Sequence, residues 1–138
     1  MKRALAVIVA SGVLAACGQG NVFSLEVGQC FQDQDAATEV SEVEVVDCDD
    51  AHDNEVYGLF DLPDGDYPGA DAVQEAAVLG CYERFEGFVG RDYESSRLDF
   101  GWLHPTSESW DNGDHEVICM LSELSGEQLI GSMKDSGV

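Results

Sequence analysis

The stretch ADAVQEAAVLGCYERFEGFV, residues 70–89, decides the fold. Its apolar residues recur every three or four positions, the spacing that lines one face of an α-helix: Val73, Ala77, Cys81, Phe85 and Phe88. Asp71 can cap this helix or lie in its first turn, where the helix dipole favours acidic groups. Gly87 and Gly90 fray and then end it. The pattern predicts one long amphipathic helix that turns Cys81 toward a core.

The segments around this helix predict a sheet. Four of them have the alternation or the β-branched and aromatic composition of strands, namely residues 39–46 (with a bulge near Ser41), 55–62, 98–103 and 116–121. Residues 107–110 predict a helical turn, and residues 126–138 are small and polar. We expect this last segment to pack briefly through Leu129 and Ile130 and then to fray. The prediction is a single α+β domain: a small antiparallel sheet of about four strands with one main helix packed on one face.

The N-terminus has the layout of a bacterial secretory signal. Lys2 and Arg3 precede an apolar run that is too short to cross a bilayer, which needs roughly 20 apolar residues. The sequence Leu14-Ala15-Ala16-Cys17 resembles a lipobox, the signal that leaves a lipidated, diacylglyceryl- and palmitate-bearing cysteine after cleavage. An ordinary secretory signal with a chance cysteine is the alternative. We expect a lipoprotein at the outer face of the plasma membrane, with its segments as follows: 1–16 signal peptide, 17–25 lipidated Cys17 and tether, 26–138 domain.

The charge of the chain restricts its partners. The sequence has 28 acidic and 6 basic residues, and Lys2 and Arg3 leave with the signal, so the mature chain carries −24. A field of this sign repels nucleic acid and anionic lipid head groups. It suits a soluble surface, cation binding or a positively charged protein partner. Because the acidic residues are spread over the whole chain, they mark no single site.

Four cysteines remain beside Cys17, an even number that predicts disulfides in an exported domain. Three pairings are open. We favour Cys30–Cys48, which closes a short loop, and Cys81–Cys119, which joins the predicted helix to a strand. Zinc is the competing use of four cysteines, but the sequence contains no CxxC pair.

The sequence contains none of the motifs of common enzymes, such as GxSxG, HExxH or a phosphate-binding glycine loop. His52, Asp53 and Glu55 are close in sequence and are candidate contact or ligand residues, although a histidine that only orders its turn is the simpler interpretation. Asp64-Gly65 does not fit a calcium loop, because apolar residues occupy the ligand positions before it. Trp110 is a second contact candidate, since it lies in a predicted loop or turn. We predict no enzyme activity, no cofactor and no metal.

Several short motifs occur in a recognisable order along the chain. They are Val27-Gly28-Gln29-Cys30-Phe31, Val46-Asp47-Cys48, Ala51-His52-Asp53-Asn54-Glu55-Val56, Phe60-Asp61-Leu62-Pro63, Tyr67-Pro68-Gly69, Phe88-Val89-Gly90, Trp110-Asp111-Asn112-Gly113-Asp114, Val117-Ile118-Cys119, Gly131-Ser132-Met133-Lys134 and Ser136-Gly137. This order resembles the septum formation family of extracytoplasmic actinobacterial domains, over about residues 25–138.

The resemblance implies a link to division septa but carries over no reaction and no catalytic residue. Residues 48–56 resemble the cysteine–histidine–acid motif of the family, which draws attention to His52, Asp53 and Glu55 without giving them a role. We expect an interaction module that binds an envelope protein or the cell wall. Two alternatives stay open: a small-ligand or metal-binding lipoprotein, and an enzyme or accessory factor of peptidoglycan metabolism.

Overall fold

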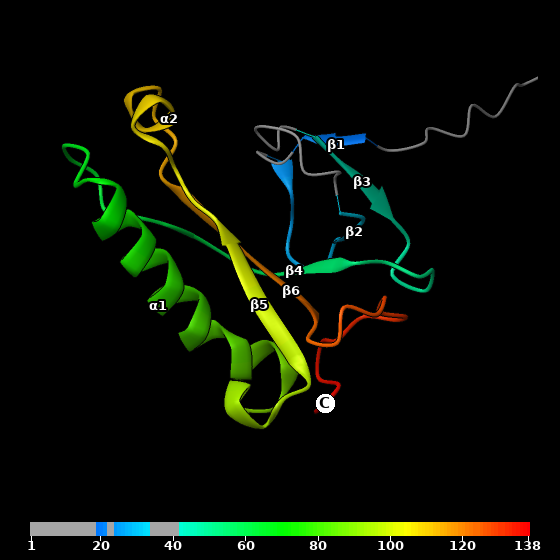
Figure 1. Cartoon of the computed structure of the whole chain (residues 1–138). Coiled ribbons are helices and arrows are strands. Elements are labelled where there is room, and N and C mark those ends of the chain that lie inside the picture. Colours follow the sequence, from blue (N-terminus) through cyan, green and yellow to red (C-terminus); the bar gives the residue numbers. More distant parts are fainter. Residues whose placement is uncertain (1–18, 22–23, 34–41) are drawn as a thin grey trace, which may run out of the picture.

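The computed structural model describes residues 19–21, 24–33 and 42–138. Its elements are, in chain order, β1 (Gln19–Asn21), β2 (Cys30–Phe31), β3 (Glu42–Val46), β4 (Asn54–Asp61), α1 (Ala70–Val89), the 3-10 turn η2 (Tyr93–Ser95), β5 (Leu98–Leu103), α2 (Ser107–Asp111) and β6 (Glu116–Glu123). The strands form one antiparallel sheet in the order β1-β3-β2-β4-β6-β5 (Figure 1). The predicted α+β class is confirmed.

The sheet has more strands than the four predicted. The additional strands β1 and β2 are three and two residues long, too short to show a period in the sequence. The predicted first strand is present as β3, while residues 39–41, with the expected bulge, lie outside the described residues. The signal segment and Cys17 lie outside them too. Gln19–Asn21, predicted as tether, pair with β3, and Leu25 is buried, so the folded part begins earlier than expected.

Helix α1 has the predicted bounds, and its predicted apolar face is buried, as the stripe of Val73, Ala77, Cys81, Phe85 and Phe88 requires. The helix ends because Gly90 adopts a left-handed conformation, with φ 81°, and its N–H donates to the Glu86 carbonyl at 2.8 Å. No side chain caps its start, where Gly69 precedes it and Asp71 lies in the first turn. Of the helices in the described ranges, none is long and apolar enough to cross a membrane.

Two apolar clusters lie on the two faces of the sheet. The larger one joins α1 to the inner face of β4, β6 and β5, where Val117, Cys119 and Leu121 alternate inward as predicted. Figure 1 shows α1 running along this part of the sheet, with β1, β2 and β3 at the far end. The smaller cluster lies on the opposite face and consists of Leu25, Phe31, Val43, Val56 and Ile118.

A register shift in β4 gives the helix its polar contact with the sheet. Val56 pairs with Met120 and Gly58 with Cys119, so Tyr57 is an extra residue, as in a β-bulge. The ring of Tyr57 is buried against α1, and its hydroxyl donates to the Cys81 carbonyl at 2.8 Å. Burial raises the pKa of Tyr57 well above its ordinary value, so this hydroxyl stays a donor at any physiological pH.

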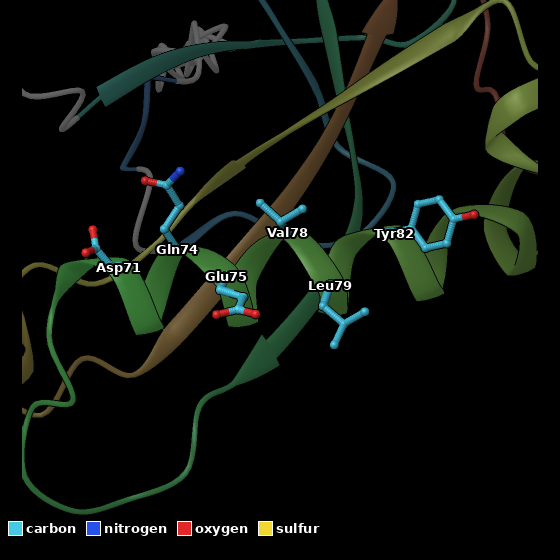
Figure 2. A pocket seen from close by; sticks show the side chains of 6 residues that line it. All are labelled: Asp71, Gln74, Glu75, Val78, Leu79 and Tyr82. Atoms are coloured by element: carbon cyan, nitrogen blue, oxygen red, sulfur yellow. The ribbon is translucent and has the colours of Figure 1, made fainter.

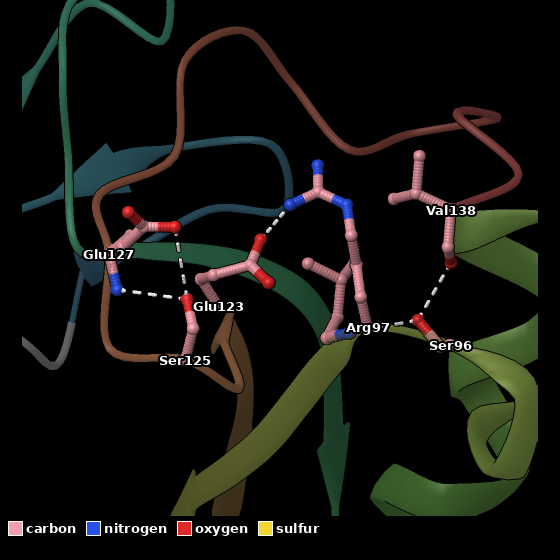
Figure 3. Close-up of polar contacts among 7 residues, drawn as sticks. Ser96, Arg97, Glu123, Ser125, Glu127 and Val138 are labelled. Atoms are coloured by element: carbon pink, nitrogen blue, oxygen red, sulfur yellow. Dashed lines mark hydrogen bonds and ion pairs between the residues drawn. The ribbon is translucent and has the colours of Figure 1, made fainter.

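The C-terminal segment packs more extensively than predicted. Met133 is buried, and the amides of Asp135 and Gly137 donate to the carbonyls of Phe88 and Val89 at the end of α1, both at 2.8 Å. The Ser96 hydroxyl donates to the Val138 carbonyl at 2.7 Å (Figure 3). The expectation that this segment frays after Leu129 and Ile130 is therefore wrong. Backbone hydrogen bonds, more than buried side chains, hold this segment in place. Small polar residues are therefore compatible with an ordered segment.

Of the two glycines in α1, Gly80 is the one where an added side chain would strike the sheet. A Cβ atom there would lie 2.2 Å from Cζ of Phe60. The Arg84 guanidinium lies over the same ring, 4.1 Å from its centroid. We expect Gly80→Ala to lower the free energy of unfolding by about 1–3 kcal/mol, because the ring must move. Gly87→Ala is the matched control, since nothing lies within 4 Å of its Cβ position. It should gain up to about 1 kcal/mol from helix propensity. Thermal unfolding tests the pair, and equal gains in both variants would refute the close contact.

Candidate functional site

Two disulfides join the four cysteines of the domain, in the pairing that the sequence favoured. Cys30 and Cys48 are joined with Cα atoms 5.2 Å apart, and Cys81 and Cys119 with Cα atoms 5.4 Å apart. Of the described residues, Cys30, Cys48 and Glu55 form the one group of three ligand-type side chains whose donor atoms lie within 4.8 Å of one another. Because its two sulfurs are bonded to each other, the group offers no thiolate to a metal or a substrate.

Glu55 is fully buried next to this disulfide, and its carboxylate holds the C-terminal segment. One oxygen, Oε1, accepts a hydrogen bond from the Ser132 hydroxyl at 2.5 Å, and Oε2 accepts one from the Met133 amide at 2.7 Å. The amide of Gly131 donates to the Cys48 carbonyl at 2.6 Å. A buried carboxylate needs donors of this kind to replace water. Glu55 therefore fixes the segment 128–138, which we call the tail, to β4.

His52 and Asp53 bind the same tail. His52 forms an antiparallel bridge with Leu129, with N···O distances of 3.0 and 2.7 Å. Its ring is fully buried, and Nδ1 lies 2.8 Å from the Asp50 carbonyl, which can only accept, so Nδ1 carries the proton. Nε2 has no hydrogen-bond partner among the described residues. Asp53 accepts from the Gln128 side chain at 3.2 Å and from the Asp33 amide at 2.9 Å.

The three residues singled out from the sequence thus lie along one strip of structure that fastens the tail. Two of them are fully buried, so they present no surface to a partner in this structure. Their partners in the tail lie more than seventy residues further along the chain and could not be identified from the sequence. One signal was available: Glu55 opens the apolar run EVYGLF, and a buried strand that begins there would bury a carboxylate, which requires hydrogen-bond donors.

Trp110 is not a loop residue that faces solvent. It lies in α2 with only 6% of its surface exposed, and its indole N–H donates to the Gly65 carbonyl at 2.8 Å. The ring packs edge-on against Tyr67 and 4.2 Å from the His115 ring, measured between centroids. The prediction of a contact residue rested on placing Trp110 in a loop or turn, whereas it lies in a short helix with a capping box.

A small acidic cleft lies beside this aromatic cluster, with Asp61, Asp64 and His115 in its walls. Nδ1 of His115 lies 3.0 Å from a carboxylate oxygen of Asp64, which is otherwise almost fully exposed. Burial, with the charges of Asp61 and Asp114, raises the pKa of the neighbouring Glu116 above its ordinary value. The carboxylates of this cleft repel anionic ligands. Its histidine is already paired with Asp64, so the cleft offers no distinct binding site.

One face of α1 exposes apolar side chains next to one another. Val78, Leu79 and Tyr82 line a shallow pocket there, together with Asp71, Gln74 and Glu75 (Figure 2). Leu79 is 57% exposed and Tyr82 is 42% exposed. The predicted core stripe of α1 lies on a different side of the helix, and neither Leu79 nor Tyr82 belongs to the buried core.

Comparison with known proteins then decides the family. A family model described as septum formation matches residues 3–119. The chain belongs to the septum formation family. A comparison with curated proteins finds no match, and a comparison with solved structures finds none either.

Membership in the septum formation family points to an extracytoplasmic role related to cell division, and the family is not known to be enzymatic. The match ends at Cys119, so it contains His52, Asp53 and Glu55 but not their partners in the tail. The motifs at 131–134 and 136–137, which contributed to the resemblance seen in the sequence, lie outside the matched residues. In this septum formation domain the histidine and acid motif contacts the tail through hydrogen bonds.

Proposed function

We propose that this protein is an interaction module of the cell envelope that acts at the division septum, held at the outer face of the plasma membrane by a lipid on Cys17. The family match over residues 3–119 carries the proposal. The lipobox-like sequence before Cys17 supports the anchor. Two disulfides in a chain of this size support a location in an oxidising compartment, since disulfides rarely persist in reducing compartments.

The short distance between anchor and domain supports an action close to the membrane. Strand β1 begins at Gln19, two residues after Cys17. Two extended residues reach about 7 Å, so the lipidated chain end would hold the sheet almost against the bilayer. A partner of such a module would be a membrane protein or a layer of the wall next to the membrane, and not a component far outside it.

A fluorescent fusion in dividing cells tests this function. The fluorophore follows Val138 through a flexible linker, which keeps the Val138 carbonyl that Ser96 binds. We expect the fusion in the membrane fraction and enriched at midcell. Cys17→Ser is the matched control; it should release the protein from the membrane fraction and abolish the midcell signal. Even labelling of the envelope in dividing cells would overturn the septal role, and a Cys17→Ser variant that still partitions into detergent would overturn the anchor.

A further inference from the structure

The face of α1 formed by Asp71, Gln74, Glu75, Val78, Leu79 and Tyr82, which we call the α1 face, has the pattern of a helix-packing surface. Asp71, Glu75, Val78 and Tyr82 follow one another at spacings of four, three and four, so they lie along one side of the helix, with the carboxylates first and the apolar residues after them. Together they extend over about 17 Å of helix. Figure 2 shows the six side chains spread along α1 from Asp71 to Tyr82.

The apolar part of the α1 face continues into an aromatic cluster. The ring of Tyr82 lies 6.1 Å from that of Tyr93 and 6.5 Å from that of Phe100, and Phe100 lies 6.0 Å from Trp102, between centroids. Phe100 and Trp102 belong to β5, the edge strand of the sheet, and are only partly buried. The surface on this flank therefore extends from one helix to the neighbouring strand, and it is backed by a packed core.

Carboxylates border this apolar surface at both ends. Asp71 and Glu75 lie at its N-terminal end, and at the other end the Tyr82 hydroxyl donates to Glu94. This hydrogen bond, with the charges of Asp92 and Glu86, raises the pKa of the Tyr82 hydroxyl. The chain has no Lys or Arg between residues 61 and 83.

The cations nearest in sequence form no ion pair with Asp71, Glu75 or Glu94 in the described part of the chain. The Arg84 guanidinium lies over the Phe60 ring on another side of α1. Arg91 donates to the Ser95 carbonyl at 3.3 Å, and Arg97 pairs with Glu123 at the end of β6. A partner must therefore bring the positive charge itself. A second copy of this chain or an anionic membrane would bring negative charge to the α1 face and be repelled.

We propose that the α1 face binds an amphipathic helix of a partner protein, with apolar side chains on one stripe and Lys or Arg beside it. Apolar anchors would pack on Val78, Leu79 and Tyr82, and the basic residues would pair with the carboxylates around them. This inference rests on the proposed function only in taking the partner to be a protein of the envelope.

The first test measures binding of a synthetic helical peptide, with leucines on one stripe and lysines on its flanks, to the soluble domain by fluorescence anisotropy. The double variant Val78→Ala and Leu79→Ala should bind at least about tenfold more weakly and keep its fold, because alanine favours the helix. The matched control, Leu124→Ala with Ile130→Ala, removes two apolar side chains that are more exposed than Leu79 and lie elsewhere. It should bind within twofold of wild type. Equal losses in both double variants would overturn the proposal, since binding would then be non-specific.

Charge and partner are tested separately. Asp71→Asn with Glu75→Gln should weaken peptide binding and flatten its dependence on salt, whereas Glu42→Gln with Glu44→Gln on β3 should change neither.

In cells, a photo-crosslinker at position 79 should capture a basic amphipathic helix that a crosslinker at position 124 does not. Capture of a lipid or of a second copy of the chain at position 79 would overturn the proposal. A wild-type protein that binds the peptide but is not enriched at midcell would refute the septal function and leave the α1 face standing.

Discussion

Replacing Cys81 and Cys119 together by alanine is expected to lower the free energy of unfolding by about 4 kcal/mol. The disulfide joins the middle of α1 to the inner strand β6 across 38 residues, so its loss frees a long loop in the unfolded chain. Both cysteines are fully buried, and the alanines also leave part of the sulfur volume empty. Thermal unfolding followed by circular dichroism measures the effect, which should lower the Tm by roughly 10 °C or more.

The other disulfide provides the comparison. Cys30 and Cys48 are only 18 residues apart, so replacing both by alanine should cost less, about 3 kcal/mol. Peptide mapping without reduction identifies the bonded pairs directly. A Cys81/Cys119 variant more stable than the Cys30/Cys48 variant, or a peptide that links Cys30 to Cys81, would contradict the arrangement of the two disulfides.

Glu55→Ala is expected to cost about 3 kcal/mol and to release the tail. The substitution leaves the Met133 amide buried without an acceptor and removes the partner of the Ser132 hydroxyl. Hydrogen exchange should become fast at Met133 and at Gly137, whose amide is bonded to the end of α1. The global Tm should fall as well, because the buried side chains of Leu129 and Met133 are part of the larger apolar cluster.

Two further variants separate the role of Glu55 from a general effect of charge. Glu44→Ala removes an exposed glutamate from β3 and should change the stability by no more than about 0.5 kcal/mol. Glu55→Gln keeps the shape of the side chain. The new amide can accept from the Met133 amide and donate to the Ser132 hydroxyl, so this variant should lose less stability than Glu55→Ala and more than Glu44→Ala. If Glu55→Ala leaves exchange in the tail slow, the fastening by this carboxylate is disproved.

The sequence predicted an element best where a regular apolar repeat runs up to a residue that ends helices or strands. Helix α1 has the predicted bounds because an unbroken apolar stripe reaches Gly90, and β5 has them because its alternating residues reach the break at Pro105. Strand β2 escaped prediction because two residues have no period; its neighbours β3 and β4 stabilise it from both sides. The tail escaped prediction because backbone amides, which look alike in every sequence, make most of its contacts.

The candidate site was predicted in part. Proximity in sequence drew attention to His52, Asp53 and Glu55 as candidate contact residues, but a role depends on partners, and those of Glu55 lie 77 and 78 residues away. Trp110 was misjudged because the sequence does not show that the Gly65 carbonyl lies within reach of its indole N–H. The α1 face was not recognised, since exposed apolar residues in a helix stand out only after the buried side is known.

The fastening of the tail sets an order of events during synthesis. Strand β4 leaves the ribosome some seventy residues before Ser132 and Met133, so the buried carboxylate of Glu55 has no donors until the tail has emerged. Because contacts between segments so far apart in the chain slow folding, we expect this domain to fold slowly and to close only once the tail is present. Under the proposed export, this delay would keep the leading part of the chain unfolded while it is threaded through the membrane. The domain would then lock on the far side, where its cysteines are oxidised.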